Sequence, residues 1–206
     1  MRIQFVLLTN LLLIFAPLAY TQSSADSESK ALSRKEWDRS EWAAKSPEEK
    51  TRITAALRST VNDERALGRV RARVALLNVG DDTTIQEAIS YYRGSYGGRH
   101  RMLSELKKTT QPRVIPLLAE DLSSEEPIKL QIYGDEFLDY PRIVSSAELM
   151  RAIILNTADL GFQVKAWANG LAGAVPSQLV AQMRVFWAKN REHFATHSYS
   201  LVSAPE

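Results

Sequence analysis

The sequence of 206 residues contains no cysteine. This absence excludes disulfide bonds, thiolate nucleophiles and metal sites built on cysteine. It also excludes a lipid anchor attached to an N-terminal cysteine. Histidine is scarce as well, with three residues in the whole sequence. A chain of this composition must therefore be held together by packing and hydrogen bonds alone.

Motifs with strict spacing are missing too. The sequence has no phosphate-binding lysine loop, no dinucleotide-binding glycine pattern, no zinc-protease histidine pair and no nucleophilic serine elbow. These absences argue against P-loop nucleotide binding and the common hydrolase chemistries. We therefore expect a non-enzymatic protein without a cofactor or a metal. The net charge of +2 is too small to indicate a nucleic-acid partner or a membrane-surface partner.

The N-terminal 25 residues have the layout of a secretory signal peptide. A single positive charge at Arg2 precedes an apolar stretch from Ile3 to Ala19, and small and polar residues follow it. We therefore predict that residues 1–25 are removed on export to the periplasm or the medium. The lack of cysteine favours a bacterial periplasmic protein. The alternative is an uncleaved N-terminal anchor, because about 17 apolar residues are the lower limit for a membrane span.

Helical periodicity dominates the rest of the sequence. Apolar residues recur every three or four positions in several short segments, which glycines such as Gly80 and Gly94 separate. We predict a polar leader with a first short helix over residues 26–45, a helical domain over 46–195 and an extended tail over 196–206. The predicted fold class is all-α, with short antiparallel helices in an irregular α-solenoid or helical array.

Capping boxes predict where several helices start, because a serine or threonine followed by glutamate three residues later satisfies the first backbone N–H groups. Each of three such pairs predicts a helix that begins directly after its first residue: Ser46 with Glu49, Thr84 with Glu87, and Ser145 with Glu148. Asp81 and Asp82 precede the second pair, and we expect them to serve the N-terminus of that helix.

Residues 127–142 depart from the helical pattern. Three apolar residues alternate there with polar ones: Ile128, Leu130 and Ile132. The alternation predicts a short strand or an extended loop. Three carboxylates follow beside two tyrosines: Asp135, Glu136 and Asp139. Roles in turns and caps are their simplest interpretation, and an enzyme with an acid–base or calcium site at 135–139 is one alternative function.

Four segments combine regular apolar spacing with turn residues at helix ends: "RVRARVALLNVGDDTTIQEAISYYR", "QPRVIPLLAEDL", "VKAWANGLAG" and "RVFWAKNREHF". Together they resemble HEAT-like α-helical repeat proteins of bacteria over residues 69–194. The resemblance implies stacked helical hairpins, which present a broad surface for binding another protein. The extended segment at 127–142 interrupts the regular repeat.

Residues 89–101, "ISYYRGSYGGRHR", gather tyrosine, glycine and arginine. Glycine-rich backbone can hold an anion, and Tyr91 and Tyr96 could stack on bases or sugars. The pattern is more typical of a connection between two helices, because Gly94 ends one apolar face and the next helix starts near Arg99. Tyr91 and Tyr96 remain candidate interaction residues.

Three arginines at intervals of four form a basic stripe on one helix face: Arg65, Arg69 and Arg73. A solvated helix face balanced by nearby acids is the simplest interpretation, and binding of an anionic surface is a second alternative function. Trp37, near the start of the exported chain, is a further candidate for contact with a partner.

His193 and His197 share a helical face at a spacing that zinc can use, but no third ligand is evident and no metal site is predicted. The sequence as a whole predicts an exported, non-enzymatic helical module that binds another protein, in an oligomeric state that it leaves open.

Overall fold

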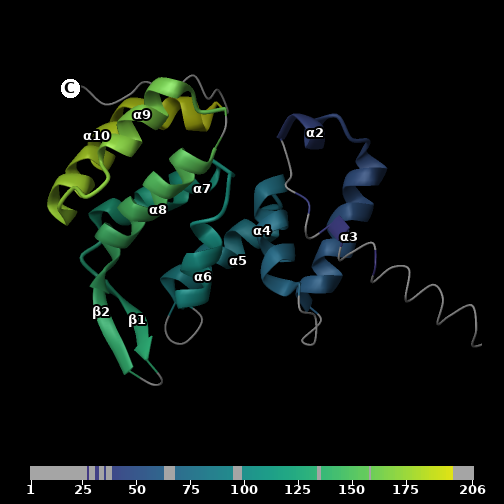
Figure 1. The fold of residues 1–206 in the computed structure, drawn as a ribbon, viewed down its shortest axis with the longest axis horizontal. Helices are drawn as coiled ribbons and strands as arrows, with labels where there is room; N and C mark the ends of the chain where they lie inside the picture. The colour runs from purple at the N-terminus through teal and green to yellow at the C-terminus, as the bar shows by residue number, and fades with distance from the viewer. Residues whose placement is uncertain are drawn as a thin grey trace, which may run out of the picture. The chain divides into compact units, whose positions relative to one another are not determined.

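A computed structural model describes residues 27, 31–32, 35, 39–62, 68–94, 99–133, 136–157 and 159–196. The predicted signal peptide (1–25) and the tail after residue 196 lie outside these residues. The chain divides into two compact units, residues 1–76 and 77–206, and each is considered by itself. Helices dominate the described residues (Figure 1), so the prediction of a mostly helical protein is confirmed.

The elements assigned to the described residues of the first unit are α2 (Arg39–Ala43), α3 (Pro47–Asn62) and the greater part of α4 (Arg69–Val79). The capping box predicted at the start of α3 is confirmed. The Ser46 hydroxyl accepts from the backbone N–H of Glu49, and the Glu49 carboxylate accepts from that of Ser46, both at 3.2 Å. Ile53 and Leu57, one turn apart on α3, are buried as their spacing predicts.

The second unit holds the remaining elements: α5 (Asp82–Arg93), α6 (Arg99–Leu106), α7 (Val114–Ala119), the 3₁₀ helix η1 (Glu120–Ser123), β1 (Pro127–Tyr133), β2 (Glu136–Pro141), α8 (Arg142–Asn156), α9 (Phe162–Gly170) and α10 (Pro176–Ala195). α8 lies at the centre of this unit (Figure 1) and packs against α7, η1, α9 and α10. It follows β2 directly, so the hairpin and the central helix share one junction.

Packing holds the second unit together, since no disulfide is possible. The apolar residues that recur every three or four positions along α5 are buried: Ile85, Ala88, Ile89 and Tyr92. α8 contributes more buried residues to this core than any other element, among them Leu149, Met150 and Ile153. Trp167 of α9 stacks on Phe186 of α10 with 5.0 Å between ring centroids. Burial of each large side chain contributes about 2 kcal/mol relative to exposure.

α5 starts three residues earlier than the capping box of Thr84 and Glu87 predicts, at Asp82. The Asp81 carboxylate accepts from the backbone N–H of Thr84 at 3.0 Å and from its hydroxyl at 2.6 Å. The predicted box is therefore wrong, and the role predicted for Asp81 at this N-terminus is confirmed. Asp81 is the N-cap because its carboxylate accepts the backbone N–H of Thr84, which would otherwise have no partner in the first turn of the helix.

Gly80 ends α4 as predicted, and its backbone φ of +80° requires glycine. A Cβ atom at this position would lie 2.8 Å from the side-chain nitrogen of Gln111. A second contact joins the end of α4 to the segment before α7. The side-chain oxygen of Asn78 accepts a hydrogen bond from the backbone N–H of Thr110 at 2.8 Å. The end of α4 is thereby tied to the connection between α6 and α7.

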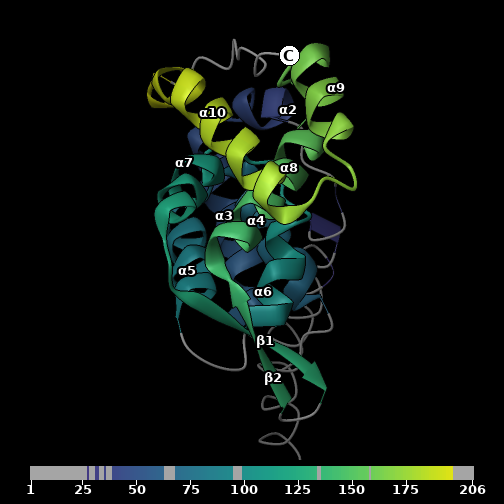
Figure 2. The same ribbon diagram turned by 90° about the vertical axis from the view of Figure 1, so that its left-hand side faces the viewer.

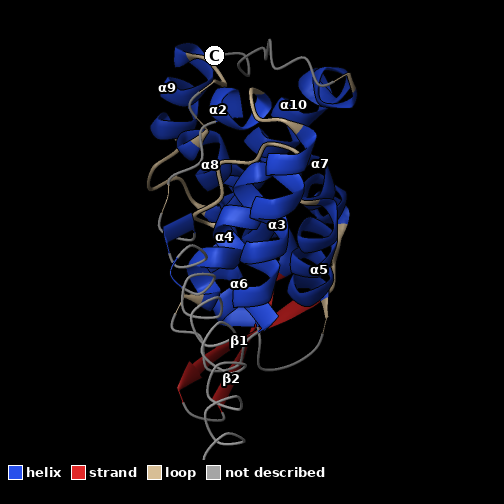
Figure 3. Ribbon diagram, turned by 90° about the vertical axis from the view of Figure 1, so that its right-hand side faces the viewer, coloured by secondary structure: helices blue, strands red, loops and turns tan. Residues whose placement is uncertain are grey.

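Residues 127–133 and 136–141 pair as the two antiparallel strands of a hairpin, which confirms the predicted extended segment and adds a second strand to it. One face pairs Ile128 with Tyr140 and Leu130 with Leu138, and Ile128 is completely buried at its base. The hairpin points away from the helices of its unit (Figure 2), and its two strands are the only sheet among the described residues (Figure 3). An apolar face therefore runs out of the core into solvent.

Candidate functional site

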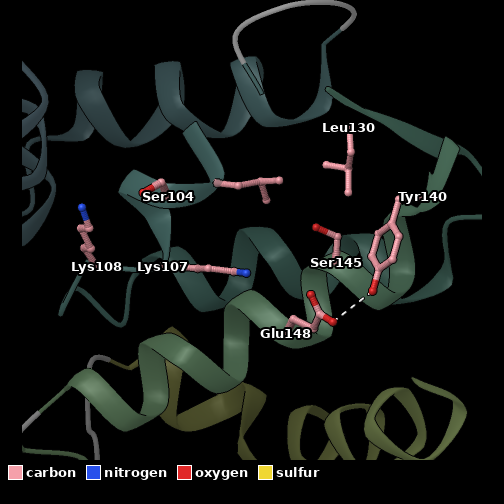
Figure 4. Close-up of a pocket in the computed structure, with 8 residues that line it drawn as sticks. Ser104, Lys107, Lys108, Leu130, Tyr140, Ser145 and Glu148 are labelled. Atoms are coloured by element: carbon pink, nitrogen blue, oxygen red, sulfur yellow. Dashed lines mark hydrogen bonds between the residues drawn. The ribbon is translucent and has the colours of Figure 1, made fainter. Parts of the chain in front are cut away.

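A cavity of about 490 Å³ lies between α6, the base of the hairpin and α8 (Figure 4). Its lining among the described residues comprises Leu103, Ser104, Lys107, Lys108, Leu130, Tyr140, Ser145 and Glu148. Ligand cavities in proteins commonly have volumes of about 300 to 1,000 Å³. This cavity is therefore large enough for a small molecule, and all of its lining belongs to the second unit.

The junction between β2 and α8 positions the polar side of the cavity. α8 begins at Arg142, directly after Pro141, so Ser145 and Glu148 lie inside its first two turns. Their spacing of three places them on the same side of the helix. The backbone N–H of Arg142 donates to the carbonyl of Glu126 at 3.3 Å, and its guanidinium pairs with the Glu126 carboxylate at 2.8 Å. These contacts attach the start of α8 to the chain before β1.

The capping box predicted from Ser145 and Glu148 is therefore wrong. The helix starts three residues before Ser145, whose side chain is buried. Glu148 instead accepts a hydrogen bond from the hydroxyl of Tyr140 at 3.0 Å. Glu148 has this partner because the hairpin places Tyr140 beside α8. A capping box considers only residues three positions apart, so it does not include Tyr140.

Tyr140 is half-buried at the end of β2, and its environment keeps its phenol neutral. Burial raises the pKa of Tyr140, and the hydrogen bond to Glu148 and the negative charge of that carboxylate raise it further, to about 12. The phenol therefore donates to one oxygen of Glu148 throughout the physiological pH range. Its bond uses the Oε1 atom of Glu148. The Oε2 atom has no donor among the described residues.

Two lysines follow the end of α6, and they differ in direction. The side chain of Lys107 extends toward Ser145 and Glu148, whereas that of Lys108 points away from them (Figure 4). Among the described residues, no carboxylate forms an ion pair with Lys107. Leu130 lies on the other side of the cavity (Figure 4), and Leu103 also lines it. The cavity thus combines an apolar wall with a cation and a carboxylate.

A second polar cluster also involves α8, near Ser145 and Glu148, but its groups hydrogen-bond to one another. The hydroxyls of Tyr92 and Ser146 are 2.7 Å apart, and the Ser146 hydroxyl donates to Asp121 at 3.4 Å. The Arg93 Nε donates to both oxygens of Asp121, at 3.1 and 3.2 Å, and its NH2 group donates to Glu120 at 2.9 Å. Burial raises the pKa of Tyr92. Each of these groups has a partner within the fold.

The connection at residues 89–101 joins α5 and α6, as predicted. Arg93, at the end of α5, forms an ion pair with Asp121, so its charge is already used within the fold. The Tyr91 side chain is 62% exposed, so it stays available as an interaction residue. Tyr96 lies outside the described residues, as does Trp37.

The predicted basic stripe is only partly within the described residues, because Arg65 lies outside them. Arg69 is half-buried, and its Nε donates to the carbonyl of Val61 at 2.9 Å. Arg73 is half-buried and also has an interaction within the fold. Arg69 therefore joins α4 to the end of α3, and this use weakens the hypothesis of an anionic-surface binder.

The carboxylates of the predicted site at 135–139 are not gathered in a cavity. Glu136 and Asp139 are exposed, and Asp139 pairs across the hairpin with Lys129 at 2.7 Å. Asp135 lies outside the described residues. An exposed carboxylate that already has a cross-strand partner is poorly placed for acid–base chemistry, which requires a desolvated group near the substrate.

Within the described part of the chain, three histidine, cysteine or acidic side chains nowhere gather closely enough to hold a metal ion. His193 is half-buried in the last turn of α10, and His197 lies outside the described residues. None of the helices in this part of the chain combines the length and the apolar character that a membrane span requires.

The sequence interpretation named none of the cavity lysines or serines as site residues. In the sequence, Tyr140 stands out only as a neighbour of the carboxylates at 135–139, and the spacing of Ser145 and Glu148 predicts a helix cap. The sequence signal for this site is the spacing of Ser145 and Glu148, which are three residues apart on one helix face. Tyr140, which donates to Glu148, comes from a different element. The chain matches no family model, and no curated protein or solved structure is significantly similar to it.

Proposed function

We propose that this chain is an exported, non-enzymatic module that binds another protein and that the β1–β2 hairpin is its contact element. One observation carries the proposal. The apolar face of the hairpin begins at Ile128 in the core and continues to Leu138, whose side chain is 50% exposed. An apolar face that leaves the core is a typical feature of a surface that another molecule covers.

β2 offers the backbone groups for this contact. Five of its six residues are exposed, and in the described part of the chain it pairs only with β1. The outer edge of such a strand carries N–H and C=O groups that can pair with another chain. A two-stranded hairpin is only marginally stable, so a third strand would stabilise it. The partner segment we propose is therefore extended and adds to β2.

Charge defines the partner segment further. β2 carries Glu136 and Asp139 and no basic residue. Lys129 already neutralises Asp139, which leaves Glu136 to attract a positive charge. We therefore expect a segment with apolar residues at alternate positions, where they meet Leu138, and with a lysine or arginine near its end.

Export and the helical-array arrangement are parts of the same proposal. Export is supported by Arg2 and the apolar stretch that follows it. The helical array is supported by the resemblance to HEAT-like proteins over residues 69–194 and by the predominance of short helices. In this arrangement the helices form the rigid body that presents the hairpin to its partner.

The test uses the protein with a C-terminal tag, expressed from its full sequence in its own host. It must first be recovered in the periplasmic extract, and its retention in the cytoplasm would contradict export. The partner captured there is then compared between wild type, Leu138→Glu and Phe162→Ser. Phe162 is 86% exposed at the start of α9, so its variant removes a similar apolar area away from the hairpin.

We expect Leu138→Glu to lose the partner and Phe162→Ser to retain it. In the wild-type complex, amide hydrogen exchange at residues 136–141 should slow because the edge becomes paired. Equal capture by Leu138→Glu and wild type would contradict the hairpin as the contact element. Circular dichroism of each variant checks that the helical fold is unchanged.

A further inference from the structure

The cavity between α6, the hairpin and α8 has two walls of opposite character. Leu103 and Leu130 form an apolar wall, and the Tyr140 ring continues it. Ser145 also lines the cavity, and Figure 4 shows its hydroxyl between Leu130 and Glu148. An amphipathic molecule is complementary to such a cavity, because its apolar body and its polar groups each find matching surface.

The polar wall carries two opposite charges that do not neutralise each other. Lys107 extends toward Glu148 (Figure 4), but no ion pair forms between them. Tyr140 binds Oε1 of Glu148 and so fixes the carboxylate, while Oε2 has no donor in the described part of the chain. Lys107 can therefore bind an anionic group of a ligand, and Glu148 can bind a cationic group beside it.

The polar lining of the cavity is partly exposed and partly buried. Ser104 and Lys107 are exposed, so the cavity is open to solvent, whereas Ser145 is buried and Glu148 is half-buried. A few polar groups placed beside apolar surface are typical of sites that fix the orientation of a ligand.

We propose that this cavity binds an apolar zwitterion, namely an apolar amino acid or a short apolar peptide. Its ammonium group donates to Oε2 of Glu148, and its carboxylate accepts from Lys107. Its apolar side chain lies against Leu103 and Leu130, and the Ser145 hydroxyl bonds to either polar group. This site is independent of strand addition at β2, so either proposal can fail without the other.

The experiment is isothermal titration calorimetry on the protein purified from expressing cells without truncation. The probes are L-leucine, L-phenylalanine and the dipeptide Leu-Leu, with hexanoate and hexylamine as ligands of one charge each. We expect the zwitterions to bind at least about tenfold more tightly than either single-charge ligand, because they satisfy both charges. Tighter binding of the dipeptide than of the amino acids would identify peptides as the ligand.

Three variants test the assigned contacts. Lys107→Met and Glu148→Gln should each weaken binding about tenfold or more, since each removes one charge-assisted hydrogen bond. The glutamine retains an acceptor for Tyr140, so the junction is preserved. Lys108→Met is the comparison variant, because Lys108 also lines the cavity but its side chain points away from Glu148 (Figure 4), so its loss of affinity should be clearly smaller than that of Lys107→Met.

Several results would overturn the proposal. One is the absence of binding by every zwitterionic probe at millimolar concentration, and another is equal binding of hexanoate and L-leucine. Equal losses in Lys107→Met and Lys108→Met would show that general positive charge, and not the assigned contact, holds the ligand. Thermal unfolding of each variant checks that an affinity change does not follow from loss of structure.

Discussion

Two tyrosine hydroxyls reach α8 in this protein, and their surroundings differ. Tyr92 from α5 lies 2.7 Å from Ser146, whereas Tyr140 from β2 donates to Glu148 at 3.0 Å. Tyr92 is completely buried, and Asp121 completes its hydrogen-bonded group. Tyr140 is half-buried and borders the cavity. Burial raises the pKa of both phenols.

The difference separates a structural group from a candidate binding group. In the Tyr92 cluster, Asp121 accepts from both Arg93 and Ser146, so its charge is used within the fold. In the Tyr140 pair, Glu148 retains one oxygen toward the cavity. Buried polar groups stabilise a fold when each has a partner, whereas a fixed charge with spare hydrogen-bonding capacity is suited to a ligand.

Loss of the Asp121 carboxylate should have the largest effect on stability. Asp121→Ala leaves Arg93 without its buried partner, and we expect the free energy of unfolding to fall by about 3 kcal/mol. Urea unfolding followed by circular dichroism measures the change. Asp139→Ala is the control, because its pair with Lys129 is exposed and is worth less than about 1 kcal/mol. Equal changes in both variants would contradict the distinction.

Removal of each tyrosine hydroxyl should have a smaller and unequal effect. Tyr92→Phe removes a buried hydrogen bond to Ser146, and it should lower the free energy of unfolding by about 1 to 2 kcal/mol. Tyr140→Phe removes a half-buried bond, so we expect a loss of about 0.5 kcal/mol or less. Parallel urea titrations measure both. A larger loss in Tyr140→Phe would reverse the assignment of the structural and the binding group.

The last predicted effect is confined to alkaline pH and concerns the pH dependence of stability. The folded protein raises the pKa of Tyr140 from 10.0 to about 12, so folding favours the neutral phenol. The stability that this shift contributes is complete below pH 10 and is lost as the pH rises through about 12. Between these values the unfolding midpoint of Tyr140→Phe should therefore decline less steeply than that of wild type. Identical slopes would show that Tyr140 titrates normally.

Local patterns predicted much of the fold. The periodic face of α5, the Ser46 box and the alternation at residues 127–133 all depend on residues a few positions apart, and the structure has each of them. The Thr84 box failed because Asp81, three residues earlier, offered a competing cap. Such competition between neighbouring polar residues is settled by backbone geometry, which composition does not reveal.

The candidate site could not be predicted in the same way. Ser145 and Glu148 matched a local motif, but their roles depend on where α8 starts and on what lies beside it. Pro141 ends β2 and Arg142 already starts the helix, which moves both residues into its interior. Lys107 follows the end of α6, about forty residues earlier, so no short window of sequence contains the cavity.

The amphipathic helices, their glycine ends and the alternating strand follow from the sequence by itself, because their causes lie within one or two turns of each residue. Tertiary structure alone decided which polar groups are satisfied. Asp121 receives Arg93 from 28 residues away, and Glu148 receives Tyr140 from the preceding hairpin. The partner of a buried charge is chosen by packing between elements, and only that packing distinguishes the closed cluster at Tyr92 from the open pair at Tyr140.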